Sequence, residues 1–203
     1  MTWKEVKLAT LQKMFAADGT EIPNDESTKE YVAGMPGAAN EALAMLCTAG
    51  KFLVKSIQIE HERKEKITEC RYDLKELAED FYSLSENQIF YENADGDYRV
   101  VTRYSRESQS KVVLTDNSTG TYTVYYNAYP PRITIATEED YELPLAPEVV
   151  VLLPLYMASQ LYKDDDNGIA TSYRNEFEVA FERLMDDSRQ PGKESWQSES
   201  GWI

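Results

Sequence analysis

The sequence predicts an α+β fold in which helical segments from both ends of the chain form one bundle, with a small antiparallel β-module inserted between them. Apolar residues recur at helical spacing near both ends, whereas short runs rich in β-branched and aromatic residues fill the middle. Neither helical end is long enough to bury its own apolar faces. We therefore expect the two ends to pack against each other.

Residues 1–50 are predicted to be helical. The start of the chain, MTWKE, has the T-x-x-E spacing of a capping box, and the residues that follow predict a helix over 3–16. The stretch DESTKEYVAGM predicts a short second helix that ends at Gly34. Pro36 suits the first turn of a third helix, PGAANEALAMLCTAG.

Residues 51–140 are predicted to form the β-module, a small sandwich or barrel. Apolar and polar residues alternate in KFLVKSIQIEHE, which predicts a strand, with ITECRYD as its partner and a short helical turn in DLKELAEDF. Further strands are predicted from β-branched and aromatic runs that polar turns separate: QIFYEN, YRVVTRY, KVVLT, TYTVYYNAY and RITIA.

Helices return in residues 141–188. One is predicted over 146–163 with a kink at Pro154, and a second over 168–187. The apolar run VVVLLPLYMA is much shorter than the about 20 residues that cross a bilayer, so we expect a helix of the core or of an interface. The side chains expected to pack in the core or between subunits are Leu152, Leu155, Tyr173, Phe177 and Phe181.

The net charge of the 203-residue chain is −15, from 36 acidic and 21 basic residues. A surface of this sign repels phosphate backbones, which argues against a nucleic-acid binder held by counterion release. The two cysteines have no C-x-x-C context, so neither a zinc site nor a disulfide framework is expected. The N-terminus lacks the apolar stretch of a signal peptide, and we expect a reducing compartment.

An acidic run in YKDDDNGIATSYRNEFE raises the question of a cation site. An EF-hand loop centred on Gly168 would place Lys163 at position 1 and Arg174 at position 12, and two cations cannot serve as calcium ligands there. We therefore interpret Asp166 or Asn167 as the cap of the last helix, with calcium or magnesium as the lesser alternative.

No catalytic set, cofactor site or metal site is predicted. His61 is the only histidine, and its surroundings, EHERKEKI, indicate a solvated hairpin end. The β-module is rich in tyrosines, of which alternation directs at least half into packing. The remainder could form a sugar-stacking platform, so a carbohydrate- or host-surface-binding module of a virion or cell-surface protein is the alternative function. The tyrosines are Tyr98, Tyr104, Tyr122, Tyr125, Tyr126 and Tyr129.

Several segments resemble the head-to-tail connector (adaptor) proteins of tailed phages and of prophages in Gram-positive hosts. The resemblance covers both helical parts, about half of the chain, and is strongest over residues 154–184. Its segments are WKEVKLATLQKMF, STKEYVAGMPGAANEAL, YDLKELAEDFYSL and PLYMASQLYKDDDNGIATSYRNEFEVAFERL.

The resemblance implies a non-enzymatic virion protein that is made in the host cytoplasm and resides in the virion neck. Such adaptors form a ring, generally twelve-fold, that joins the portal to the stopper or tail-completion protein. Viral DNA passes through this conduit without specific binding. The C-terminal segment of these proteins reaches the portal, which here makes Trp196, Trp202 and Ile203 of the polar tail 189–203 the expected anchors.

Overall fold

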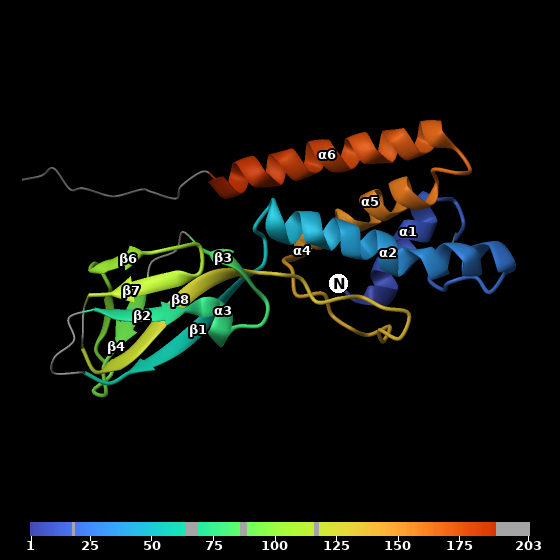
Figure 1. The fold of residues 1–203 in the computed structure, drawn as a ribbon. Coiled ribbons are helices and arrows are strands. Elements are labelled where there is room, and N and C mark those ends of the chain that lie inside the picture. The colour runs from blue at the N-terminus through green and yellow to red at the C-terminus, as the bar shows by residue number, and fades with distance from the viewer. Residues whose placement is uncertain (18, 64–68, 86–88, 116–117, 190–203) are drawn as a thin grey trace, which may run out of the picture.

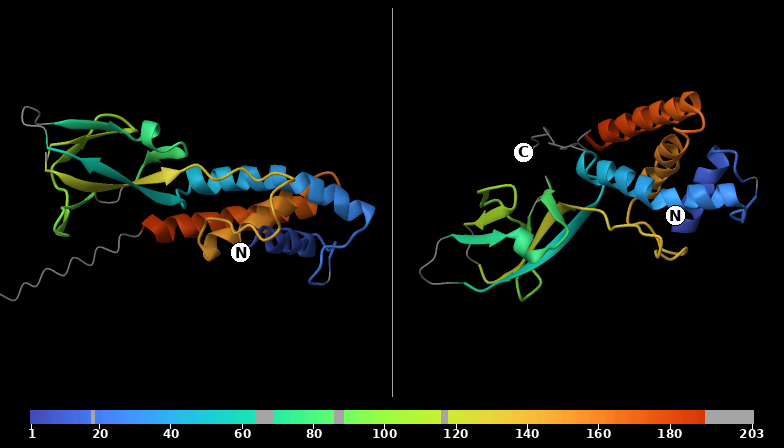
Figure 2. Two further views of the ribbon diagram at one scale, coloured as in Figure 1. Left: turned by 90° about the horizontal axis from the view of Figure 1, so that it is seen from below. Right: turned by 45° about the vertical axis from the view of Figure 1, so that its right-hand side comes forward.

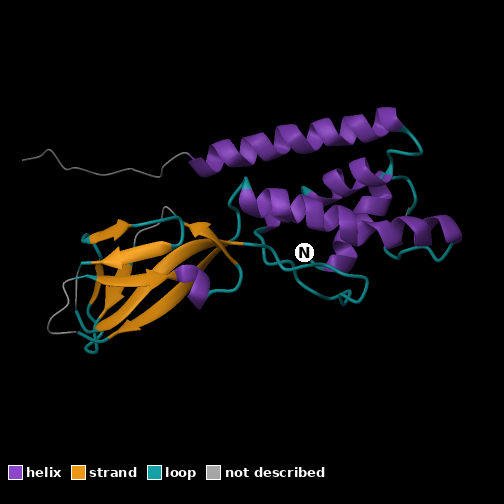
Figure 3. Cartoon of the chain, viewed as in Figure 1, coloured by secondary structure: helices purple, strands orange, loops and turns teal. Residues whose placement is uncertain are grey.

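The computed structural model describes residues 1–17, 19–63, 69–85, 89–115 and 118–189 (Figure 1). Helices gather at one side of the molecule and strands at the other, so the fold is of the α+β class (Figure 3). Two further views show that the strands lie beyond one end of the helices instead of beneath them (Figure 2). The inserted segment thus extends the molecule along the helices.

The helices come from both ends of the chain. The N-terminal part contributes α1 (Trp3–Lys13) and α2 (Glu26–Thr48). The C-terminal part contributes α4 (Pro147–Val150), α5 (Leu153–Leu161) and α6 (Asn167–Arg189). Helix α5 contacts α1, α2 and α6, so the short apolar run near residue 155 occupies the centre of the helical part.

One apolar cluster joins these helices. Val6 from α1, Leu43 from α2, Met157 from α5 and Phe177 from α6 are all fully buried in it. Each side chain of this size that leaves water contributes about 1.5–3 kcal/mol to the stability of the fold. The expected packing of the two ends of the chain against each other is therefore observed.

Helix α2 is continuous, so the prediction of separate helices on either side of Gly34 and Pro36 is wrong. Asp25 caps the helix by accepting a hydrogen bond from the N–H of Thr28 at 2.8 Å. A Cβ at Gly34 would lie 2.9 Å from Leu161 Cδ2, which shows that the glycine allows α5 to approach closely. Packing of this kind outweighs the single hydrogen bond that Pro36 cannot donate.

Helices α4 and α5 replace the single kinked helix predicted over 146–163. The break falls at Val151 and Leu152, and Pro154 lies in the first turn of α5. A proline is tolerated there because the first N–H groups of a helix have no intrahelical acceptor. Pro154 therefore begins a helix instead of bending one.

The inserted segment forms two antiparallel sheets. The larger is built around β8 (Gly120–Ala128), which pairs along its length with β1 (Val54–His61). The opposite edge of β8 pairs with β4 (Phe90–Glu92) near its start and with β3 (Phe81–Leu84) near its end, and β5 (Tyr98–Val100) follows β4. The smaller sheet has the order β2 (Cys70–Asp73), β7 (Lys111–Leu114) and β6 (Tyr104–Arg106).

Both sheets contribute to a second apolar cluster. It contains Ile59 of β1, Tyr122 of β8 and Leu114 of β7, with Leu74 from the short helix α3 (Leu74–Leu77). In the described part of the chain the strands do not close into a barrel. Of the two predicted alternatives, the barrel is therefore wrong.

Three strand predictions are wrong. The segment ITECRYD supplies β2, whose partner is β7 of the smaller sheet and not β1. The run YRVVTRY is not one strand, because its residues are divided between β5 of the larger sheet and β6 of the smaller one. The run RITIA is not a strand, and its backbone bonds the side chain of Asn40 on α2 instead. Asn40 Nδ2 donates to the carbonyl oxygen of Ile133 at 2.8 Å, and the Ile133 N–H donates to Asn40 Oδ1 at 2.8 Å.

The Asn40 contact gives a testable prediction for stability. Replacing Asn40 with Ala leaves the N–H and C=O of the buried Ile133 without their partner, so the free energy of unfolding should fall by about 1–3 kcal/mol. Chemical denaturation measures this change. The control is Asn175→Ala on the exposed face of α6, which should change stability by no more than about 0.5 kcal/mol. Equal effects of the two substitutions would show that Asn40 does not anchor the segment.

Candidate functional site

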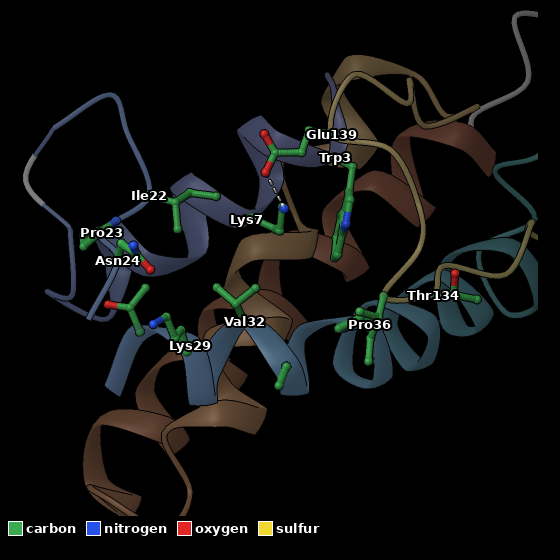
Figure 4. Close-up of a pocket in the computed structure, with 13 residues that line it drawn as sticks. Trp3, Lys7, Ile22, Pro23, Asn24, Lys29, Val32, Pro36, Thr134 and Glu139 are labelled. Atoms are coloured by element: carbon green, nitrogen blue, oxygen red, sulfur yellow. Dashed lines mark hydrogen bonds and ion pairs between the residues drawn. The ribbon is translucent and has the colours of Figure 1, made fainter. Parts of the chain in front are cut away.

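An open cleft of about 490 Å³ lies beside the helical core (Figure 4). Its walls come from the first half of α1, from residues 22–36, which lead into α2 and form its first half, and from the segment 134–139. Apolar side chains dominate the lining. These include Trp3, Ile22, Pro23, Val32, Pro36 and Ile135.

Backbone hydrogen bonds fix the outer wall of the cleft. The N–H of Trp3 donates to the carbonyl of Tyr141 at 2.8 Å, and the N–H of Lys4 donates to that of Glu139 at 2.9 Å. These bonds use N–H groups of the first turn of α1, which have no acceptor within the helix. The long segment between β8 and α4 is thereby held against α1 at one point and against Asn40 at another.

One ion pair lies at the cleft. The Lys7 side chain is 11% exposed, and its Nζ lies 3.0 Å from Glu139 Oε1 and 5.9 Å from the centre of the Trp3 ring (Figure 4). The hydrogen bond from Lys7 lowers the pKa of Glu139. Because a buried cation requires a partner, this pair stabilises Lys7 in its position beneath the apolar walls.

None of the residues that line the cleft is a histidine or a cysteine, and the hydroxyl of Thr28 already donates to Asp25 at 2.9 Å. Of the lining side chains that could carry charge, Lys7 and Glu139 are paired with each other. The cleft is suited to receiving an apolar side chain of another protein.

The acidic corner, residues 164–166, is engaged in structural contacts. Asp166 Oδ1 accepts hydrogen bonds from the N–H groups of Gly168 and Ile169 at 2.8 and 3.0 Å, which is the geometry of a helix cap. Asn167 is the first residue of α6. Asp165 accepts a hydrogen bond from the Tyr31 hydroxyl, and this bond raises the pKa of Tyr31 to about 12. Among the described residues, no group of three His, Cys, Asp or Glu side chains could hold a metal ion.

Comparison with known protein families identifies a match to the SU10 adaptor protein model over residues 7–198. This range covers both helical parts and the β-module. The chain belongs to the SU10 adaptor protein family. The adaptor is accordingly a structural protein of phages, and the family indicates a location in the virion together with other virion proteins.

No curated protein matches the adaptor. None of the helices in the described ranges is long and apolar enough to cross a membrane. The functional assignment from comparison rests on the family match.

The apolar residues predicted for the core or an interface lie around α5 and α6. Phe177 is fully buried and Leu152 is 3% exposed, whereas Leu155 and Phe181 are half-buried against the same cluster. The Phe177 and Phe181 rings stack with their centres 5.7 Å apart. Tyr173 is also half-buried, and its hydroxyl donates to the carbonyl of Lys13 at the end of α1. The predicted anchors Trp196, Trp202 and Ile203 lie outside the described residues.

His61 is buried, so the prediction of a solvated hairpin end is wrong. It is 4% exposed, with Nδ1 2.6 Å from the Tyr72 hydroxyl and Nε2 3.8 Å from the Cys70 sulfur. The cause is the pairing of β2 in the other sheet, which brings these residues opposite the end of β1. Burial of the histidine between two sheets indicates a packing role.

The tyrosines of the β-module divide between core and surface. Tyr122 and Tyr126 are buried, whereas Tyr98 is 60% exposed. The Tyr98 ring stacks on Phe90 with the ring centres 5.1 Å apart, and the edge of Tyr125 meets the same phenylalanine. One face of the Tyr98 ring is thus covered by Phe90, whereas Tyr98 and Tyr129, which is 49% exposed, still present aromatic surface to solvent.

The cleft itself was not identified from the sequence. Its residues are distant in the chain and carry no motif, because Trp3, Val32 and Ile135 meet only after three separate segments have folded. Pro36 is the one cleft residue whose sequence carried a signal. A proline within a continuous helix has no N–H to donate, so the carbonyl oxygen of Val32, four residues earlier, lacks its usual hydrogen bond.

The cap of α2 gives a prediction for pH dependence. Hydrogen bonds from the Thr28 N–H and from the side chains of Ser27 and Thr28 lower the pKa of Asp25 to about 2. An unfolded aspartate has a pKa of about 3.9, so the ionised form stabilises the fold above pH of about 4. This contribution is lost as the pH falls towards about 2. Replacing Asp25 with Asn should therefore flatten the decline of stability in this window, as followed by denaturation at each pH. An unchanged decline would contradict the role of Asp25.

Proposed function

We propose that the adaptor is a subunit of a homo-oligomeric ring, dodecameric by the resemblance described above, in the neck of a tailed phage. The ring joins the portal to the stopper or tail-completion protein and lines the conduit through which DNA is packaged and ejected. The observation that carries this proposal is the family match over residues 7–198. The role is structural and not catalytic.

Apolar surface on the helical part supports assembly with copies of the chain. Val151 between α4 and α5 is 54% exposed, and Val179 on α6 is 49% exposed. The open cleft adds further apolar surface between α1 and α2. Apolar surface that a single chain leaves uncovered is typical of proteins that bury it against a partner.

The charge of the adaptor suits a conduit for DNA. A net charge of −15 leaves the protein repelled by phosphate, so DNA can pass without being retained by counterion release. Specific binding of viral DNA is therefore not part of the proposed function.

The proposed division of the chain is supported by its two apolar clusters. Residues 1–50 and 141–188 form the connector core, and residues 51–140 form an inserted module with a cluster of its own. Ile133 and Cys47 lie near the boundaries, and each packs in the cluster of the other part. The tail 189–203 attaches the ring to the portal. Its anchors are Trp196, Trp202 and Ile203, because large aromatic side chains provide much of the binding energy in protein interfaces.

Assembly with the portal tests the proposed function. Purified adaptor mixed with its portal protein should yield rings that mass photometry detects as a complex of defined mass and negative-stain microscopy shows as annular particles. The adaptor alone can serve as the reference for the free state. The proposal would be ruled out if the chain remains monomeric and does not bind the portal over the whole accessible concentration range.

The tail provides a separate prediction. Removing residues 190–203, which follow α6, should weaken portal attachment by at least about tenfold while the melting temperature is retained. The double substitution Trp196→Ala and Trp202→Ala should have most of this effect, because it removes the aromatic anchors and keeps the length of the tail. Attachment of the truncated chain with wild-type affinity would show that the portal binds elsewhere.

A further inference from the structure

Phe15 is displayed on the surface in an unusual conformation. It follows the end of α1, has a φ angle of 57° and is 79% exposed. Its N–H donates to the carbonyl of Gln12 at 3.2 Å, and the N–H of Ala16 donates to that of Leu11 at 2.9 Å. These bonds form the helix-ending motif in which the residue at the position of Phe15 adopts the left-handed conformation and is usually glycine.

A phenylalanine at this position is unfavourable for the isolated chain. Its Cβ is strained in the left-handed region, and its ring remains in water. Glycine would remove both disadvantages. A large apolar side chain that stands at an exposed site against local preference points to a role in a contact with another chain.

Two tyrosines fix the backbone just before Phe15. The Tyr162 hydroxyl, at the end of α5, donates to the carbonyl of Met14 at 3.0 Å. The Tyr173 hydroxyl, on α6, donates to the carbonyl of Lys13. The two residues before Phe15 are therefore attached to the C-terminal helices, so the aromatic side chain projects from a defined backbone instead of a loose turn.

The cleft beside the helical core offers apolar space for an aromatic ring. Phe15 is not among its lining residues, and the cleft volume of about 490 Å³ leaves space between Ile22, Val32 and Pro36. Ile135 lines the cleft and is 85% exposed. Among the described residues, Ile135 and Phe15 are the two large apolar side chains with the greatest exposure.

We propose that the Phe15 ring of one adaptor copy inserts into the cleft between α1 and α2 of the next copy, where it packs against Ile22, Val32 and Pro36 and covers Ile135. The inference rests on the proposed ring and deepens it by naming the contact between subunits. The Phe15 ring and the cleft are different surfaces of one chain, so within the proposed ring their contact is heterologous, with each copy giving its ring to one neighbour and receiving that of the other. A heterologous contact repeated around a closed rotation makes a ring in which every Phe15 side chain and every cleft is used.

A second copy fits the cleft better than an unrelated partner because the chain itself supplies the matching side chain. Lys7, the buried cation at the cleft, is already paired with Glu139, so an uncharged occupant does not disturb this ion pair. The aromatic ring meets this requirement, and its burial is the kind of contact that dominates interface energies.

Cross-linking tests which two surfaces meet. Chains with Phe15→Cys and chains with Ile135→Cys are mixed in the presence of portal and treated with a short bis-maleimide. The wild-type chain, whose Cys47 and Cys70 are buried, controls for native thiols. Dimers of the two variants with each other are expected, with little product from either variant alone. Efficient cross-linking of the Phe15→Cys chain with itself would overturn the heterologous contact, as would the absence of mixed dimers in rings that still form.

Replacing Phe15 with Gly separates assembly from folding. The variant should unfold at the wild-type temperature or above it, because glycine suits the left-handed position, and should need at least about tenfold more protein to form rings with portal. Leu77→Ser is the matched control, since Leu77 is 48% exposed but belongs to the β-module. It should leave ring formation unchanged.

The outcomes distinguish this inference from the proposed function. If wild-type and Phe15→Gly chains both form rings at the same concentration, the contact through Phe15 is wrong and the ring proposal stands. If wild-type chains form no rings with portal under any condition, the proposed function itself fails. Equal losses in Phe15→Gly and Leu77→Ser would contradict the assignment of the contact to the cleft.

Discussion

The architecture depends on the burial of α5 between helices from opposite ends of the chain. This helix is too short and too apolar to be stable alone, and it contacts α1 and α2 on the N-terminal side and α6 on the C-terminal side. Met157 of α5 and Phe177 of α6 are fully buried in the cluster that results. Because the ends of the chain complete each other's core, the β-module can be inserted between them without interrupting it.

The β-module is built on a similar principle with its own central element. Strand β8 pairs with β1 on one edge and with β4 and β3 on the other, so the longest strand organises the larger sheet. From β8 the chain returns to the helices through a segment with little regular structure. Asn40 and the first turn of α1 provide the hydrogen bonds that fix this return, and the same contacts shape one wall of the cleft.

The sequence predicted the fold class, the sharing of one core by both ends and most strands, because these features follow from local periodicity. The predictions failed where contacts between residues far apart in the chain determine the structure. Pro36 would end an isolated helix, yet α2 continues because Gly34 packs closely on α5. His61 lies in a charged stretch but becomes buried when β2 joins the other sheet. Phe15 was predicted as part of the first helix, whereas α1 ends at Lys13 and the ring is exposed. The cleft depends on three segments that no local pattern connects.

These features fit a protein whose exposed apolar surface binds neighbouring chains instead of a substrate. The family match, the apolar walls of the cleft and the exposure of Phe15 all support this interpretation. An electron cryo-microscopy map of the adaptor bound to its portal tests this account most directly. The account predicts a closed ring in which each cleft is filled by an adjacent subunit and the helical ends contact the portal. A bound adaptor present as single, separated chains with empty clefts exposed to solvent would contradict it.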